Sequence, residues 1–211
     1  MPHSTRSAAA SLLLPALMLL SLLSCTSSRQ LCEGDLLFCL SAQGNHITAV
    51  THGAEGRQID HVAIVHFHEG SPFALEATHR GVCLTPMDSF MQQRQHLVVA
   101  ARLRDTVGVS ASVERALANL GRPYDFLFMP GDSAIYCSEL VQTTYRDRQG
   151  RLIFYTIPMS FHDATGRITP YWTHYYAQRG LRVPENMPGS NPGNLSRSSK
   201  LRLFKPAVKA K

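Results

Sequence analysis

Residues 121–142 constrain the fold and the chemistry of this chain more than any other stretch. A polar, turn-rich loop leads to Cys137. The residues after Cys137 have the apolar spacing, and the Ser and Glu near the start, that are typical of a helix. A thiol at the start of a helix faces unpaired N–H groups and the positive end of the helix dipole, which favour the thiolate. The sequence therefore indicates a nucleophilic cysteine, and the alternative is a buried structural cysteine.

Two apolar runs earlier in the chain have the length and composition of buried strands. The first follows Gly34-Asp35 and covers residues 36–40, and the second covers residues 60–68. In the second run, the period of two places His61 on the face of Ala63, Val65 and Phe67, opposite His66 and His68. His61 is thus predicted at the start of a strand, where a base can reach a thiol on a facing helix.

These motifs resemble those of the NlpC-type (NlpC/p-sixty superfamily) papain-fold cysteine hydrolases. The resemblance is carried by Gly34-Asp35-Leu36, His61-Val62-Ala63-Ile64, Gly121-x-Pro123-Tyr124 and Tyr136-Cys137-Ser138-Glu139-Leu140-Val141. In the common members the cysteine motif comes first, whereas here it comes last, as in the circularly permuted YiiX/YebB-like branch. The resemblance covers about residues 31–160. It implies an α+β, circularly permuted papain-like (NlpC-type) fold, with an antiparallel sheet packed against the helix that carries Cys137.

The same resemblance implies the roles of five residues. Cys137 is the expected nucleophile, His61 its base, and Glu76 the acid that orients His61; Tyr124 and Tyr136 are expected to contact the substrate or the oxyanion. An acid within an apolar strand is costly unless it is paired, so a buried salt bridge elsewhere is the alternative for Glu76. His79 is a rival for the orienting role.

No metal or organic cofactor is expected. The pair His66 and His68 has the spacing of two metal ligands, but the sequence offers no obvious third ligand. Histidines near the surface at a strand end are therefore the interpretation for both.

Residues 1–24 have the pattern of a signal peptide. A positive end precedes a short apolar core, and Leu22-Leu23-Ser24-Cys25 resembles a bacterial lipobox. We expect lipidation of Cys25, a linker over residues 25–33 and a lipid-anchored protein of the bacterial envelope, at the outer membrane and facing the periplasm or the surface. An ordinary signal peptide or an uncleaved anchor is the alternative.

The formal net charge of +6 does not indicate a nucleic-acid partner. Much of the positive charge lies in the signal and in the basic end from Arg197 to Lys211, and the remainder is nearly balanced. A nucleic-acid groove needs basic residues on the folded surface. Residues 34–180 are expected to form the hydrolase domain, and residues 181–211 an irregular basic tail. The tail could touch anionic lipid or remain solvated, and a run at residues 191–196 resembles a packed segment of the same permuted family.

Local patterns predict the remaining elements. We expect strands over residues 73–78, 81–85 and 97–103, and a strand or an extended segment over 151–154. Helices are expected over residues 87–93, capped by Thr85-Pro86, and over 112–121, capped by Ser112. An aromatic run at residues 170–176 is predicted to precede or form a short helix, as core or as a grip on substrate. The pairing of Cys32, Cys39 and Cys83 and the oligomeric state stay open.

Three functions compete. The first is a cysteine amidase or peptidase acting on cell-wall peptides; the second is lipid acyl transfer or lipid amide hydrolysis of the lecithin–retinol acyltransferase type; the third is a non-catalytic binding module. Tyr136 stands where wall peptidases of the common branch usually have Asp, and Glu139 where they usually have Gly. The loss of an acid beside the thiol predicts weak activity on intact peptidoglycan and better activity on small amides or acylated amines.

Overall fold

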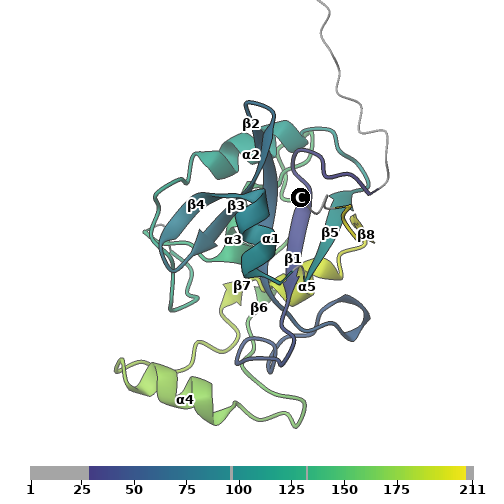
Figure 1. The fold of residues 1–211 in the computed structure, drawn as a ribbon. Helices are drawn as coiled ribbons and strands as arrows, with labels where there is room; N and C mark the ends of the chain where they lie inside the picture. The colour runs from purple at the N-terminus through teal and green to yellow at the C-terminus, as the bar shows by residue number, and fades with distance from the viewer. Residues whose placement is uncertain (1–28, 96, 132, 208–211) are drawn as a thin grey trace, which may run out of the picture.

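The computed structural model describes residues 29–95, 97–131 and 133–207. A six-stranded antiparallel sheet runs through it in the order β4-β3-β2-β1-β5-β8 (Figure 1). The strands are β1 (Leu36–Leu40), β2 (Ile59–His68), β3 (Ser71–Thr78), β4 (Gly81–Pro86), β5 (Val98–Leu103) and β8 (Leu201–Phe204). The antiparallel sheet and its helices agree with the α+β class expected from the sequence.

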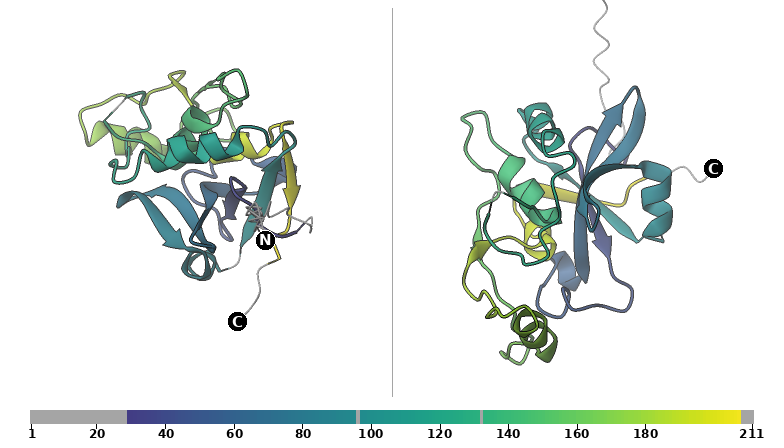
Figure 2. Two further views of the ribbon diagram at one scale, coloured as in Figure 1. Left: turned by 90° about the horizontal axis from the view of Figure 1, so that it is seen from above. Right: turned by 90° about the vertical axis from the view of Figure 1, so that its left-hand side faces the viewer.

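Helices cover both faces of this sheet (Figure 2). On one face lie α2 (Val109–Leu117), α3 (Cys137–Thr144) and α5 (Pro192–Ser196), over a core that includes Leu36, Phe38 and Leu75. On the other face α1 (Met87–Gln93) covers a smaller core around Leu37 and Val65. The apolar alternation of the strands supplies both cores, since neighbouring residues of one strand point to opposite faces.

The alternation predicted for β2 is confirmed by the two cores. Val62 and Ile64 belong to the core under α3, whereas Ala63 and Val65 belong to the core under α1. The pairing of β1 with β2 shifts by one residue at this end, where Cys39 pairs with His61 and Leu40 with Ile59. A bulge of this kind bends a strand and re-aims its side chains, and here it lies beside His61.

Two expectations about helix starts were wrong. Helix α2 begins at Val109 after Gly108, and Ser112 lies inside it, because Gly108 has the left-handed backbone, with φ of 83°, that lets the chain turn into the helix. No Thr85 hydroxyl caps α1, since that side chain bonds elsewhere. The segment 151–154, expected to be a strand or an extended segment, makes an isolated antiparallel bridge between Leu152 and Arg146.

Residues 181–207, expected within an irregular tail, contain regular structure. They include β7 (Pro188–Gly189), α5 and β8, and β8 pairs with β5 over residues 100–103 and forms one edge of the sheet. The core contacts of Leu195 and Leu201 explain this order, because both side chains are buried among sheet and helix residues.

A second layer of structure lies at one end of the sheet. We call residues 157–189 the aromatic cap; they comprise β6 (Ile157–Pro158), α4 (Pro170–Ala177) and β7, which pairs with β6 (Figure 1). Its buried residues Met159, Phe161, Trp172 and Tyr176 form a cluster separate from both sheet cores. The helix predicted from the aromatic run is therefore present as α4.

The predicted signal peptide and Cys25 lie outside the described residues. Within residues 29–207, apart from the two undescribed positions, the helices all fall short of the length and hydropathy that a bilayer span requires.

Candidate active site

Cys137 is the first residue of α3. Tyr136, in extended conformation, precedes the helix, and the Glu139 carboxylate accepts a hydrogen bond from the Tyr136 N–H at 3.4 Å. The first N–H groups of a helix lack partners within it, so the thiol lies at the positive end of α3. The side chain is packed into the core with Leu140 and Val141, and Cys137 is 5% exposed.

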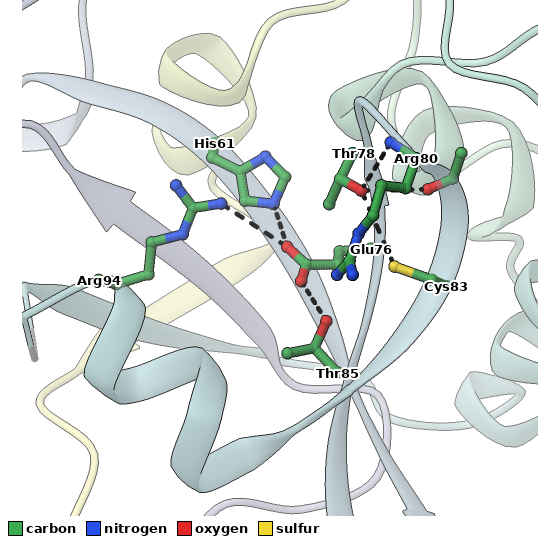
Figure 3. A network of polar contacts seen from close by, with 8 residues as sticks. His61, Glu76, Thr78, Arg80, Cys83, Thr85 and Arg94 are labelled. Carbon is green, nitrogen blue, oxygen red and sulfur yellow. Dashed lines mark hydrogen bonds and ion pairs between the residues drawn. The ribbon is translucent and has the colours of Figure 1, made fainter.

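His61 and Glu76 form a buried pair on neighbouring strands. His61 Nε2 lies 2.7 Å from Glu76 Oε2, and the two residues are 8% and 2% exposed (Figure 3). Cys137 lies close enough to His61 to raise the pKa of the imidazole. Since Glu76 occupies Nε2, the second ring nitrogen, Nδ1, is the one left for the thiol. The structure thus brings together the three residues that the sequence predicted to act as a unit.

Two further side chains hold Glu76 in place. The Thr85 hydroxyl donates a hydrogen bond to Glu76 Oε1 at 2.6 Å, and an Arg94 guanidinium nitrogen lies 3.7 Å from Oε2 (Figure 3). Every oxygen of the carboxylate therefore has a partner, as a buried charge requires. Neither Thr85 nor Arg94 was predicted as a partner of Glu76, although both follow it closely in the sequence. The alternation of β4 could have indicated Thr85, because residue 85 lies on the same strand as Cys83, which pairs with Glu76.

His61 bridges the two faces of the sheet. Glu76 shares its strand face with Ala74, which belongs to the core under α1, whereas Cys137 belongs to the core under α3. His61 contacts both Glu76 and Cys137. The bulge beside His61 makes this possible, because a bulge re-aims the side chains next to it.

The electrostatics of the pair favour charged forms. Burial lowers the pKa of His61, but the Cys137 thiolate and the Glu76 carboxylate raise it more, to about 9. Burial also raises the pKa of Glu76, but hydrogen bonds from His61 and Thr85 and the charge of Arg94 bring it below its ordinary value. The two shifts favour an imidazolium on His61 beside the Glu76 carboxylate.

Tyr124 reaches the site through a loop that closes on itself. The Ile135 N–H bonds to Pro123 O at 2.9 Å and the Asp125 N–H to Ile135 O at 3.2 Å, which sets Tyr124 beside the residues before α3. Burial and the nearby Cys137 thiolate raise the pKa of Tyr124. Its hydroxyl therefore keeps its proton and can donate a hydrogen bond.

Tyr136 joins the sheet to the aromatic cap. Its hydroxyl accepts a hydrogen bond from the Ser190 N–H at 3.0 Å, and burial raises its pKa to about 12. Its ring packs edge-on against Phe128, with 5.4 Å between centroids. Tyr136 thus presents its ring beside Cys137, while its hydroxyl is already engaged.

Two pockets flank the thiol and the imidazole. The pocket that Cys137 lines, here called the thiol pocket, is walled mainly by Ile47, Val50, Phe128, Met159, Phe161 and Trp172. The pocket that His61 lines, here called the histidine pocket, is walled by polar residues that include Asn45, Thr78, His79 and Arg94. Ile47, Asp60 and Tyr124 line both pockets. The aromatic run was expected to serve as core or as a grip on substrate, and Trp172 of that run lies in the wall of the thiol pocket.

The other candidate residues lie apart from this group. His79 lines the histidine pocket, but the described contacts of His61 are with Glu76 and Cys137. His66 Nδ1 pairs with Glu33 at 2.9 Å. In the described part of the chain, no group of three or more His, Cys, Asp or Glu residues is arranged to hold a metal ion. Cys39, Cys83 and Cys137 are free thiols.

The chain is similar to known proteins over most of its described length. The model of the permuted papain-like amidase family, described as YaeF/YiiX, C92 family, matches residues 30–203. The uncharacterised protein YiiX of Escherichia coli (strain K12) is 29% identical over 124 residues, which span 56% of this chain and 58% of that relative. The crystal structure of the metalloprotein yiiX from Escherichia coli O157:H7 covers 85% of this chain and 99% of its own, with a TM-score of 0.69 and 20% identity. The two chains therefore share their fold, and the α+β, permuted papain-like fold expected from the sequence is confirmed. On the family match, this chain belongs to the C92 family of permuted papain-like amidases.

Proposed function

We propose that this protein is a cysteine hydrolase of amide or ester bonds that works through an acyl-enzyme. One observation carries the proposal. A thiol at the start of a helix, an imidazole and a carboxylate lie next to one another in space, and His61 Nε2 is 2.7 Å from Glu76 Oε2. Nucleophile, base and orienting acid in this relation are the recurring arrangement of acyl-transfer enzymes. The family match supports amidase chemistry.

The reaction follows from the positions of these groups. The Cys137 thiolate attacks the carbonyl carbon, and the new oxyanion is stabilised by the backbone N–H of Cys137 and the Tyr124 hydroxyl. Imidazolium His61 gives its proton to the leaving amine as the C–N bond breaks, which leaves a thioester on Cys137. His61, again neutral, takes a proton from water as the water attacks the thioester, and the acid and the thiolate are released.

The substrate class is an uncharged small amide or an acylated amine rather than intact cell wall. Tyr136 presents a ring, not a carboxylate, beside Cys137, and the walls of the thiol pocket are aromatic and aliphatic. Such a lining favours a neutral acyl group over the free amine of a wall stem peptide. Cell-wall peptides, lipid acyl groups and a purely binding role are the competing assignments; the buried charged chain of Glu76, His61 and Cys137 disfavours the last of these, because ionisable groups are costly to bury without use or pairing.

Mass spectrometry can separate these assignments. The soluble domain is incubated with purified peptidoglycan fragments, acyl lipids and small acyl amides, and the products are compared with those of Cys137→Ala. We expect release of acid from the small amides by the wild type alone. Robust release of stem-peptide fragments from intact sacculi by the wild type, but not by the variant, would instead assign a wall peptidase.

We further propose that the protein is anchored in the bacterial envelope through lipid on Cys25, at the outer membrane. The support is the sequence pattern of residues 1–25. Cys25→Ala is expected to block processing or to release the protein from the membrane fraction, as read by fractionation and by the mass of the mature N-terminus. A mature chain that starts beyond residue 25 with an unmodified residue would contradict the proposal, while leaving the hydrolase assignment intact.

A further inference from the structure

The two pockets are not equivalent with respect to the chemistry. Cys137 lines the thiol pocket and His61 lines the histidine pocket. In the proposed reaction His61 must reach the leaving amine, and Cys137 keeps the acyl group. The amine therefore lies on the side of the histidine pocket, and the acyl group extends into the thiol pocket.

The thiol pocket contains little that could pair with a charge. Its described lining includes no Lys, Arg or His side chain, so an acyl group with a carboxylate would find no cation there. Its acidic side chain, Asp60, also lines the histidine pocket and accepts a hydrogen bond from Asn45 at 2.6 Å. Asp60 thus stands at the boundary between the pockets, and the interior beyond it favours an uncharged group.

Two serine hydroxyls in this lining have no hydrogen-bond partner. The Oγ atoms of Ser138 and Ser190 are buried and unpaired in the described structure, and the residues are 1% and 3% exposed. Ser138 belongs to the first turn of α3, and Ser190 follows β7 of the aromatic cap, where its N–H bonds Tyr136. A buried hydroxyl without a partner destabilises the fold. A ligand atom that forms a hydrogen bond with either hydroxyl removes this cost and therefore binds more tightly. Both hydroxyls can donate and accept, which suits a neutral oxygen.

The free space of the thiol pocket limits the size of the group. It amounts to about 40 Å³, whereas a single water requires roughly 10–15 Å³ on such a measure. Only a few heavy atoms fit between Cys137 and the walls formed by Phe128, Met159 and Trp172. A long acyl chain would have to displace these side chains from a packed aromatic cluster.

We propose that the thiol pocket selects a short, uncharged acyl group, of about two to four carbons, that carries a hydroxyl or another neutral oxygen for Ser138 and Ser190. This inference rests on the proposed hydrolase function and specifies its acyl side. It favours small hydroxyacyl amides over unsubstituted, aminoacyl and long-chain acyl amides.

A series of amides that share one fluorogenic amine tests the inference, because the leaving group is then constant. The acyl groups are butyryl, 3-hydroxybutyryl, alanyl and octanoyl, and kcat/KM is measured for each with the full folded domain. We expect 3-hydroxybutyryl to exceed butyryl by about 10-fold, and alanyl and octanoyl to fall below butyryl. Ser190→Ala is expected to bring the ratio of 3-hydroxybutyryl to butyryl close to one.

Ser160→Ala is the matched control. Ser160 also lines the thiol pocket, but its hydroxyl is exposed and lies 3.0 Å from His162 Nδ1, so this variant should keep the wild-type ratio. The inference is wrong if kcat/KM for the octanoyl or alanyl amide equals or exceeds that for the 3-hydroxybutyryl amide, with turnover that depends on Cys137. It is also wrong if Ser190→Ala leaves the ratio of 3-hydroxybutyryl to butyryl unchanged. Neither result contradicts the hydrolase function. Absence of any turnover, together with no labelling of Cys137 by iodoacetamide, overturns the hydrolase itself.

Discussion

The sheet and the aromatic cap contribute to one site by different physical means. The sheet holds His61 and Glu76 on adjacent strands, where regular backbone pairing fixes their separation and buried charges fix their orientation. The cap presents Met159, Phe161 and Trp172, which are positioned by ring packing and by a few hydrogen bonds to loops. In the proposed function, the first region carries out the reaction and the second selects the acyl group that reaches the thiol.

The cap is held by contacts that reach across long loops. The Tyr175 and Tyr176 hydroxyls donate to Phe126 O and Leu127 O, at 2.9 and 2.7 Å. The next residue, Phe128, has a φ of 52°, a left-handed backbone that a bulky residue rarely adopts. Its ring packs on Tyr136 and on Trp172. Local strain is thus maintained beside the thiol pocket by the surrounding aromatic packing.

The largest effect is expected from Cys137→Ala, which should abolish the hydrolase activity and leave the sheet and the aromatic cap folded. Cys137→Ala replaces one small buried side chain with another, so the domain should fold with a near-native circular dichroism spectrum. Turnover of a small amide should fall by about 10⁴-fold or more, since the nucleophile acts as a unit with His61. Iodoacetamide should label Cys137 in the wild type and should label no cysteine in the variant, as read by peptide mass spectrometry. Label on Cys83 or Cys39 in the wild type, with Cys137 unlabelled, would refute the assignment.

The next effect tests whether Glu76 orients the His61 imidazole, as distinct from the attack by the Cys137 thiol. Glu76→Gln should lower kcat by roughly 10²-fold, less than His61→Ala, because the imidazole remains but is oriented by a neutral amide. In the wild type, the His61 proton is lost as the pH rises through about 9, so kcat/KM should fall above that pH. The carboxylate raises the pKa of His61, and its removal should therefore move this alkaline limb to lower pH.

The pH profile also distinguishes an orienting role from a structural one. A Glu76→Gln variant that loses activity at every pH, with its alkaline limb unmoved, would indicate damage to the fold instead. Thermal unfolding of the same variant provides the check on folding.

A smaller effect is expected in the aromatic cap. Trp172→Ala removes a wall of the thiol pocket and the hydrogen bond from Trp172 Nε1 to His46 O, at 3.1 Å. We expect kcat/KM for a small amide to fall by about 10-fold, because the acyl group is less well positioned, while iodoacetamide still labels Cys137. Tyr171→Ala is the control, since Tyr171 stacks on His46 from the same helix but does not line the pocket. Loss of Cys137 labelling in Trp172→Ala would show that the two regions are not separable.

The smallest effect concerns the support of Glu76. Thr85→Val keeps the shape of the side chain but removes the donor that lies 2.6 Å from Glu76 Oε1. The pKa of Glu76 should rise because Thr85 helps to lower it, and kcat should fall by only a few-fold, with a loss of about 1 kcal/mol in unfolding free energy. Thr144→Val removes a similar hydroxyl, which donates to Leu140 O at the far end of α3, and should leave kcat unchanged. Equal losses in the two variants would assign Thr85 a general structural role.

The sheet region could be predicted from sequence because its signals are local. The period of two in β2 predicts the two faces of the strand. The four short motifs predict the permuted papain-like fold and, with it, the grouping of Cys137, His61 and Glu76. Their meeting in space agrees with the prediction, although the catalytic roles remain to be tested. The bulge beside His61 has no such local signal.

The cap could not be predicted in the same way because its contacts are distant in sequence. Ser190 meets Tyr136 across 54 positions, and Trp172 meets His46 across 126. No periodic pattern links such residues, and the turn-rich composition of residues 184–199 favoured an irregular tail. Arg94 was missed for a related reason: it follows a helix whose position over the sheet fixes its contact with Glu76.

The hydrogen bond from Ala207 N–H to Arg29 O, at 2.8 Å, brings the two ends of the described chain together. The order of the motifs is then a matter of where the chain is opened, and the packed structure does not depend on it. A short linker between residues 29 and 207, with a new opening between Asp105 and Thr106 in the turn before α2, would place the cysteine helix ahead of the histidine strand. Such a rearranged chain would have the motif order of ordinary papain-like hydrolases and would keep each contact of the site. In this fold, the order of the motifs along the chain can therefore change without a change in the geometry of the site.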